Sequence, residues 1–259
     1  MVGYLTAYAG ELSCASLQRR LTSISQAHKA AGWDDPPTRH RLVRRAWEGI
    51  RRVHGREPNR KAPLRSSDIR ALVATCDTTR LGGLRDRALL VLGFAGAFRR
   101  SELVALNVED LDWQGDGLVV HIRRSKTDQE GQGATVGILF GSDPATCPVR
   151  TVRAWLEVAG ITEGAVFRQV DRHGNMGGRL TGKSAAERVK VACTRAGLPA
   201  ERYGGHSLRA GLITDAIEHG ATEDRTMRHT RHKSVHVFRT YVRDLNLLDR
   251  TNPLAVVGL

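Results

Sequence analysis

The sequence predicts a mostly helical protein with a small antiparallel sheet. Apolar residues recur at helical spacing through most of the 259 residues. Gly117 to Arg124 and Ala134 to Phe140 have the character of strands, and the polar, glycine-bearing segment between them predicts a hairpin. The chain lacks the regular alternation of strands and helices that would build a parallel sheet.

The first sixty residues predict a small helical domain. Residues 14 to 31 form one amphipathic stretch. Pro36-Pro37-Thr38 predicts a stop followed by a helix cap, and Leu42 to Val53 predicts the next helix. The polar stretch from His54 to Lys61 predicts a linker. We therefore expect two domains, residues 1–60 and 61–259.

The second domain contains most of the expected helices. A capped helix is expected to begin at Ser67, and the nearly continuous apolar stretch from Leu84 to Ala97 predicts the helix at the centre of the core. Further helical stretches are Val149 to Val158, Ser184 to Arg195, Ser207 to Glu218 and the chain from Thr222 onward.

The charge of the chain favours a polyanionic partner. Its formal net charge is +13 and its pI is near 10.4, from 40 basic and 27 acidic residues. Such an excess favours nucleic acid over an anionic membrane. Only six of the basic residues are lysines, and the arginine fork suits phosphate oxygens. A genomic preference for arginine codons could explain this ratio, but not the net charge.

Basic side chains gather on the two N-terminal helices and at the end of one expected strand. They could form a solvated surface, but beside the overall charge we expect contacts with the phosphates of double-stranded DNA. The candidate DNA-binding residues are Arg19, Arg20, Lys29, Arg41, Arg44, Arg45 and Arg124.

The cysteines and the hydropathy pattern favour a cytoplasmic protein without membrane association. Cys14, Cys76, Cys147 and Cys193 are far apart and form no CxxC pair, so neither disulfides nor a zinc site is expected. No signal-peptide pattern begins the sequence, and its longest apolar run, Ala88 to Ala97, is too short to span a bilayer.

Two motifs suggest other functions and are weak. Gly177 to Ser184 matches the phosphate-binding pattern GxxxxGK[ST], but six residues separate it from the possible strand at Ala165 to Val170. A glycine-rich loop before a helix is the simpler interpretation. His229, His232 and His236 have a spacing that could bind zinc on one helical face, but Ser234 predicts a helix start inside the set. We expect no metal.

The richest cluster of polar side chains is near the C-terminus. His206 and Arg209 are three residues apart on one expected helix, so they point to the same side and can hold one anion. His232 and Tyr241 are nine residues apart and would lie on opposite faces of an unbroken helix. We therefore expect a break, with Ser234 capping a new helix that carries Tyr241. Alone, such a tyrosine would more often be a core residue.

An arginine follows the apolar core helix. Burying Arg99 there is costly unless an anion meets it. Glu102 could be that anion in a structural pair, or Arg99 could face a phosphate while Glu102 orients it. Lys126, in the expected hairpin loop, would by itself be a solvated lysine.

In order and local context these residues resemble the tyrosine recombinases, or phage-type integrases. The resemblance covers Pro63 to Tyr241 and fills every expected polar position. It is carried by Ala97-Phe98-Arg99-Arg100-Ser101-Glu102-Leu103, Lys126, His206-x-x-Arg209, Arg231-His232 and Tyr241.

The resemblance implies a tyrosine-recombinase catalytic domain preceded by a helical core-binding domain. Residues 4 to 64 are similar to the second half of that domain. In the family, the full core-binding domain has further helices before the position that corresponds to Met1. We therefore expect residues 1–60 to be a partial, N-terminally truncated core-binding domain. The implied function is site-specific DNA integration or excision, and the alternative is a catalytically silent DNA-binding remnant of an integrase.

The resemblance also implies the roles of six site residues. Tyr241 would attack the scissile phosphate and form a 3′-phosphotyrosine bond. Arg99 and Arg209 would clamp the non-bridging oxygens, and His206 and His232 would donate hydrogen bonds to them. His206 would also accept the tyrosine proton, and Lys126 would protonate the leaving 5′-oxygen.

The implied reaction requires no cofactor and no small-molecule substrate. Fixed guanidinium groups can stabilise the charge of a phosphoryl transition state. The covalent intermediate keeps the energy of the phosphodiester bond, so rejoining requires neither ATP nor a metal. The implied assembly is a homo-tetramer on two DNA duplexes.

Overall fold

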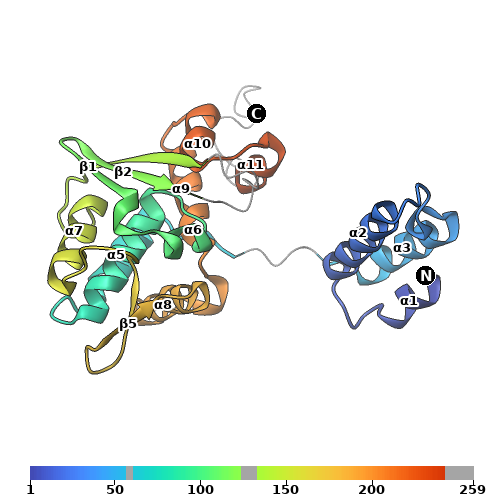
Figure 1. The fold of residues 1–259 in the computed structure, drawn as a ribbon, viewed down its shortest axis with the longest axis horizontal. Helices are drawn as coiled ribbons and strands as arrows, with labels where there is room; N and C mark the ends of the chain where they lie inside the picture. Colours follow the sequence, from blue (N-terminus) through green and yellow to red (C-terminus); the bar gives the residue numbers. More distant parts are fainter. Residues whose placement is uncertain (57–60, 124–132, 243–259) are drawn as a thin grey trace, which may run out of the picture. The chain divides into compact units, whose positions relative to one another are not determined.

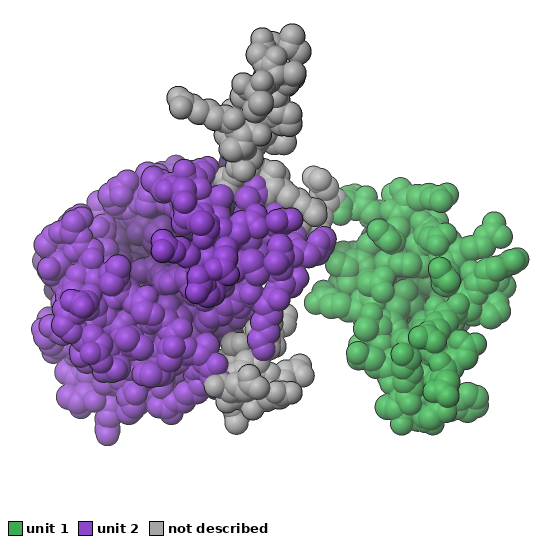
Figure 2. All heavy atoms as spheres, turned by 90° about the horizontal axis from the view of Figure 1, so that it is seen from above, with its two compact units in different colours: residues 1–60 green, residues 61–259 purple. Residues whose placement is uncertain are grey.

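The computed structural model describes residues 1–56, 61–123 and 133–242. The chain divides into two compact units, Met1–Arg60 and Lys61–Leu259 (Figures 1 and 2). Each unit has its own cluster of buried apolar side chains. Each therefore has the separate core that an independent domain requires.

The N-terminal unit consists of the helices α1 (Val2–Ala7), α2 (Cys14–Ala30) and α3 (Arg41–His54). Helix α2 begins after Ser13, whose side chain accepts a hydrogen bond from the backbone of Ser16 at 3.2 Å. The apolar stripes of the three helices meet in a small core. Its buried members are Leu5, Leu17, Leu21, Val43 and Ile50.

Two features of this unit differ from our expectations. Helix α1 is not predicted because its six residues are too few for a periodic pattern, yet it completes the core with the fully buried Leu5. The residue that caps α3 is His40 and not Thr38. A 3₁₀ turn occupies Pro37–Arg39, and the imidazole of His40 accepts the backbone N–H of Leu42 at 3.3 Å.

Helix α5 (Leu81–Ala95) lies at the centre of the second unit (Figure 1), and its residues 88 to 92 are almost completely buried. This confirms the core helix that the apolar run predicts. The helices with the most extensive contacts to α5 are α4 (Ser66–Ala74), α6 (Arg100–Ala105), α7 (Pro148–Ala159), α8 (Gly182–Arg195) and α9 (Ser207–Glu218).

Two short helices, α10 (Glu223–Thr230) and α11 (Val235–Val242), pack against α9. The gap between them confirms the helix break expected at Ser234. Ser234 caps the start of α11. Its hydroxyl accepts a hydrogen bond from the N–H of Val237 at 3.4 Å, and its carbonyl accepts one from the N–H of Phe238 at 3.0 Å. None of the described helices is long and apolar enough to cross a lipid bilayer.

The larger sheet has three antiparallel strands in the order β1 (Leu111–Gln114), β2 (Gly117–Ile122) and β3 (Ala134–Leu139). The mostly helical fold with a small antiparallel sheet is therefore as predicted. Buried residues pair across β2 and β3, as with Leu118 and Ile138. Strand β1 is not predicted because four residues are too few to show alternation; pairing with β2 specifies it.

The glycine-rich sequence from 177 to 184 does not form a phosphate-binding loop. Gly177 and Gly178 lie in strand β5 (Met176–Arg179), which pairs with the antiparallel strand β4 (Arg168–Val170). The hydroxyl of Thr181 then caps α8 by accepting the N–H of Ser184 at 3.1 Å. Gly177 and Gly178 are in extended conformation within a paired strand, so our expectation of a glycine-rich loop is wrong. The nucleotide-binding alternative therefore lacks the loop that it requires.

Gly211 allows α9 to pack directly on the backbone of the segment that precedes α4. A Cβ at Gly211 would lie 1.7 Å from the carbonyl oxygen of Leu64. That backbone is itself held, because the N–H of Leu64 donates to the carbonyl of Ser207 at 3.0 Å.

We expect Gly211→Ala to lower the free energy of unfolding by about 1–3 kcal/mol, as overpacking does. Gly82→Ala is the control, because Gly82 is also helical and a Cβ at this position would meet no neighbouring segment within 4 Å. It should be neutral or stabilising. Urea unfolding followed by circular dichroism measures both, and equal stabilities would contradict this account of the packing.

Candidate active site

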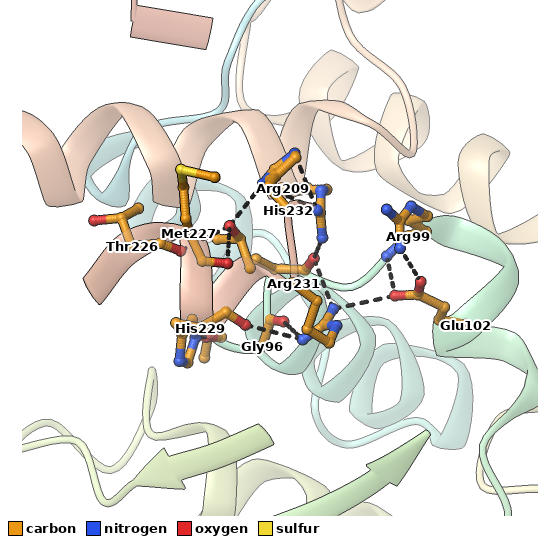
Figure 3. Close-up of polar contacts among 12 residues, drawn as sticks. Gly96, Arg99, Glu102, Arg209, Thr226, Met227, His229, Arg231 and His232 are labelled. Carbon is orange, nitrogen blue, oxygen red and sulfur yellow. Dashed lines mark hydrogen bonds and ion pairs between the residues drawn. The ribbon is translucent and has the colours of Figure 1, made fainter. Parts of the chain in front are cut away.

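Side chains at the start of α6, on α9 and at the end of α10 converge beside the turn that follows α5 (Figure 3). Aromatic side chains of α11 contact the same cluster. Gly96, Ala97 and the buried Phe98 form this turn. Ala97 has a φ of 45°, a left-handed conformation that is disfavoured for a residue with a Cβ. The turn redirects the chain into α6, and Arg99 stands at the start of that helix.

The carbonyl groups of the turn accept hydrogen bonds from two arginines far along the chain. Arg209 Nη1 donates to the carbonyl of Ala97 at 2.6 Å, and Arg231 Nη1 donates to that of Gly96 at 3.2 Å. The last carbonyls of a helix lack intrahelical donors and carry partial negative charge. The end of α5 and the turn that follows it therefore hold the two guanidinium groups in one place.

Glu102 joins two of the arginines in the site. Its carboxylate accepts the backbone N–H of Arg99 at 3.0 Å, the Nη1 of the same residue at 2.5 Å and the Nη2 of Arg231 at 3.1 Å. Burial opposes ionisation, but the hydrogen bonds from Arg99 and the charges of both arginines hold the pKa of Glu102 below its ordinary value. The predicted Arg99–Glu102 pair is thus present, while the contact of Arg99 with a phosphate stays a prediction.

Arg209 is a buried cation. The residue is 1% exposed, and its Nη2 lies 3.1 Å from Nε2 of His232. Burial, together with repulsion from Arg99 and Arg231, lowers the pKa of Arg209 to about 10. The guanidinium is therefore still charged at neutral pH, and its charge is poorly screened by solvent.

His232 is a neutral imidazole among cations. Burial first, and then the charges of Arg209, Arg99 and Arg231, lower the pKa of His232 to about 4. Because a guanidinium can only donate, His232 accepts the hydrogen bond from Arg209. Its Nδ1 lies 2.7 Å from the hydroxyl of Thr230, which itself donates to the carbonyl of Thr226 at 2.7 Å. These contacts orient the ring.

Tyr241 lies next to this imidazole. The ring centroids of Tyr241 and His232 are 5.5 Å apart, and Phe238 lies at the same distance from His232. Phe238 is fully buried and anchors α11, whereas Tyr241 is only half-buried. Tyr241 also interacts electrostatically with Arg209. The break at Ser234 is what turns this tyrosine back toward the arginines.

The remaining predicted site residues are placed less fully. His206 is an exposed residue at the start of α9, one helical turn before Arg209, as the spacing predicts. Lys126 and Arg124 lie outside the described residues. Four of the six predicted catalytic residues, namely Arg99, Arg209, His232 and Tyr241, are thus brought together in one set of contacts.

The three histidines with zinc-like spacing have separate environments. His229 Nε2 lies 2.7 Å from the carbonyl of Ala95, His232 contacts Arg209, and His236 is exposed on α11. They do not share a helical face, because α10 ends before His232. In the part of the chain that the structure describes, no three potential ligands are grouped for a metal.

The predicted DNA-binding residues of the first unit do not share one face. Lys29 and Arg44 line a groove of about 630 Å³ between α2 and α3. Arg20 is nine residues from Lys29 and so points to the opposite side of α2. Its Nη1 donates to the hydroxyl of Tyr4 at 2.8 Å, and its guanidinium lies 5.2 Å from the ring centroid of Tyr8. The other candidates, Arg19, Arg41 and Arg45, are exposed.

The sequence does not distinguish Arg231 as a residue of this cluster. Arg231 belongs to the motif quoted above but receives no role, and one arginine beside a histidine is no signal in so basic a chain. Its backbone has a φ of 58° and ends α10 in the left-handed conformation usually taken by glycine. Such a conformation costs a residue with a Cβ about 1–2 kcal/mol. Only its tertiary contacts identify it.

The depressed pKa of His232 predicts a stability that depends on pH. Between about pH 6.5 and 4 the unfolded chain protonates this histidine and the folded chain does not. Its contribution is therefore complete above pH 6.5 and is lost as the pH falls toward 4. We expect urea unfolding to show a loss of stability from pH 7 to pH 5 that is smaller in His232→Gln. His236→Gln, at an exposed position, should leave the loss unchanged; equal losses in all three proteins would contradict the burial of His232.

Comparison with known proteins agrees with this geometry. Residues 63–246 match the phage integrase family. The chain is 37% identical over 250 residues to an integrase/recombinase xerD homolog from Selenomonas ruminantium, covering 95% of this chain and 73% of the relative.

Solved structures share the fold. One is the XerH site-specific recombinase bound to palindromic difH substrate, a post-cleavage complex, with a TM-score of 0.68 and 15% sequence identity. The match covers 99% of this chain and 71% of the XerH chain. Another is the Tn1549 transposon integrase (aa 82-397, Y379F) in complex with transposon right end DNA, with a TM-score of 0.66 and 13% sequence identity. The match covers 100% of this chain and 83% of the Tn1549 integrase chain. With the arrangement of arginines, histidine and tyrosine described above, these matches lead to one conclusion: the chain belongs to the phage integrase family of tyrosine recombinases.

Proposed function

We propose that this protein is a site-specific DNA recombinase that cuts and rejoins DNA through a 3′-phosphotyrosine intermediate, and that it integrates or excises a mobile element. The observation that carries the proposal is the contact between Arg209 and His232, with the ring of Tyr241 5.5 Å from the imidazole. DNA as the partner is supported by the similar structures, which include recombinases bound to DNA.

The arginines would bind the scissile phosphate. A phosphoryl transition state spreads negative charge over its non-bridging oxygens, and preorganised donors stabilise it. Arg99 and Arg209 are two such donors, and Glu102 and the carbonyl of Ala97 hold them in place. Because the pKa of Arg209 stays near 10, its guanidinium would keep its charge through the reaction.

His232 would change its hydrogen-bond partner when DNA binds. Without DNA its ring accepts from Arg209 Nη2. A phosphate oxygen would compete for that N–H because it is the stronger, charged acceptor. The imidazole could then turn its own N–H toward the phosphate, as the family resemblance implies.

The covalent step would exchange one phosphate ester for another. The hydroxyl oxygen of Tyr241 would form a bond to phosphorus while the bond from phosphorus to the 5′-oxygen breaks. The tyrosine proton would pass to His206, and Lys126 would give a proton to the leaving 5′-oxygen. Attack by a 5′-hydroxyl on the phosphotyrosine would reverse these transfers and rejoin the strand.

The first unit would also bind DNA. We propose that Met1–Arg60 belongs to a core-binding domain and that Lys61–Leu259 is the catalytic domain. The groove that carries Lys29 and Arg44 supports phosphate contact, because both cations lie at one concave surface. The active assembly would be a homo-tetramer on two duplexes.

The alternative is a DNA-binding remnant that does not cleave. A nicked suicide substrate, which loses the broken strand by diffusion, separates the two functions because it traps the covalent intermediate. We expect the chain to form an adduct with this DNA that survives denaturing electrophoresis. Tyr241→Phe should abolish the adduct, since phenylalanine lacks the nucleophilic oxygen.

Lys183→Ala is the matched control for this experiment. Lys183 would be essential to a phosphate-binding loop, but it is exposed in the first turn of α8. Its removal should leave the adduct unchanged. Binding of the nicked DNA without any adduct in the parent protein would favour the remnant and reject the recombinase.

DNA binding should depend steeply on salt. Each phosphate contact releases counterions and adds roughly 0.9 to the slope of log affinity against log salt. We expect Arg44→Ala to reduce that slope by about 0.9 in filter binding or fluorescence anisotropy. Arg153→Ala removes the same charge from a guanidinium that lies 4.9 Å from the ring centroid of Trp113, and it should not change the slope. Equal slopes for Arg44→Ala and the parent would contradict phosphate contact by Arg44 in this groove.

A further inference from the structure

Two residues other than glycine have positive φ in the described part of the chain, and one side chain connects them. They are Ala97, with a φ of 45°, and Arg231, with a φ of 58°. The guanidinium of Arg231 donates to the carbonyl of Ala97 at 3.3 Å and to that of Gly96 at 3.2 Å. One side chain therefore links the two disfavoured backbone conformations. The carbonyls that it contacts belong to residues 134 and 135 positions before Arg231 in the sequence.

The same guanidinium also reaches the pair that holds Arg99. Arg231 Nη2 donates to Glu102 Oε2 at 3.1 Å, and Glu102 Oε1 accepts from Arg99 Nη1 at 2.5 Å. The carbonyl of Ala97 that Arg231 contacts is also the acceptor for Arg209 at 2.6 Å. Arg231 thus contacts the group that orients each of the two proposed phosphate-binding arginines (Figure 3).

We propose that Arg231 is a positioning residue of the recombination site, which fixes Arg99 through Glu102 and Arg209 through the turn at Ala97. This inference rests on the proposed function. A glycine would adopt the backbone conformation of residue 231 without strain. It would lack the planar fork that spans a carboxylate and two carbonyls at once, so the side chain is what justifies the strained conformation.

The environment of Arg231 favours positioning over direct contact with DNA. Its side chain is 11% exposed and lies over Phe98, with 5.2 Å between the guanidinium carbon and the ring centroid. Its Nη atoms are already engaged by the turn and by Glu102, and its Nε is buried without a hydrogen-bond partner among the described residues. Arg231 therefore acts on the reaction through its neighbours.

The test uses Arg231→Gly, which removes the fork and suits the left-handed backbone. We expect its covalent adduct with the nicked substrate to form about ten- to a hundred-fold more slowly at saturating DNA, because misplaced catalytic groups cost rates of this size. The dissociation constant for DNA should stay unchanged. Added guanidinium ion, at concentrations far below those that unfold proteins, should restore part of the rate by filling the vacated site.

Four controls separate positioning from simple stabilisation. Urea has nearly the shape of guanidinium without its charge and should not rescue Arg231→Gly, and sodium chloride matches the ionic strength. Arg228→Ala removes an exposed arginine of the same helix, paired only with Asp224 at 2.7 Å among the described residues, and should react normally. Arg231→Lys keeps the charge without the fork and should give an intermediate rate.

The outcomes distinguish the two proposals. An Arg231→Gly protein that reacts at the parental rate, or a slow one that guanidinium does not accelerate more than urea does, would overturn the role of Arg231 alone. A parent protein that forms no adduct would overturn the proposed function itself. If Arg231→Gly does not fold, the comparison of Arg231→Lys with the parent replaces it, and equal rates of those two proteins would reject positioning by the fork.

Discussion

The carboxylate of Glu102 supplies the negative charge that allows three arginines to lie close together away from solvent. Arg99, Arg209 and Arg231 repel one another, and this repulsion contributes to the lowered pKa values of Arg209 and Arg231. Glu102 is 2% exposed and contacts two of the three guanidinium groups directly. One carboxylate does not neutralise three cations, and the positive charge that remains favours the binding of an anion, as the proposed phosphate contact requires.

Carbonyl groups at the end of helix α5 and in the turn after it offset a further part of that repulsion. The interior residues of α5 are almost completely buried, so its last carbonyls have fixed positions in the core of the unit. The carbonyl of Gly96, which ends the helix, accepts from Arg231, and the carbonyl of Ala97 in the next turn accepts from Arg209. A helix that is apolar on nearly all sides thus does two things: it organises the core, and it presents acceptors to residues that follow it by more than a hundred positions.

His232 shows how the same charges control an uncharged group. In water an imidazole is partly protonated near neutral pH, but here burial and neighbouring cations disfavour a further positive charge. The neutral ring can accept from Arg209, which a protonated ring could not do. The resting arrangement of the proposed phosphate-binding groups therefore depends on this histidine remaining neutral.

Local sequence determined most of the helices, the strands β2 and β3 and the break at Ser234, because periodicity, turn residues and capping act within a few residues of chain. The ordered set from Arg99 to Tyr241 also identified the family, since its residue types and order are specific. Local signals could not identify strand β1, the extended conformation of Gly177 and Gly178, or the contacts of Arg20 with Tyr4 and Tyr8, because these depend on pairing and packing. Only the tertiary structure gave Arg231 its place, because its partners Gly96, Ala97 and Glu102 lie 129 to 135 residues away and meet it only when α10 packs beside the end of α5.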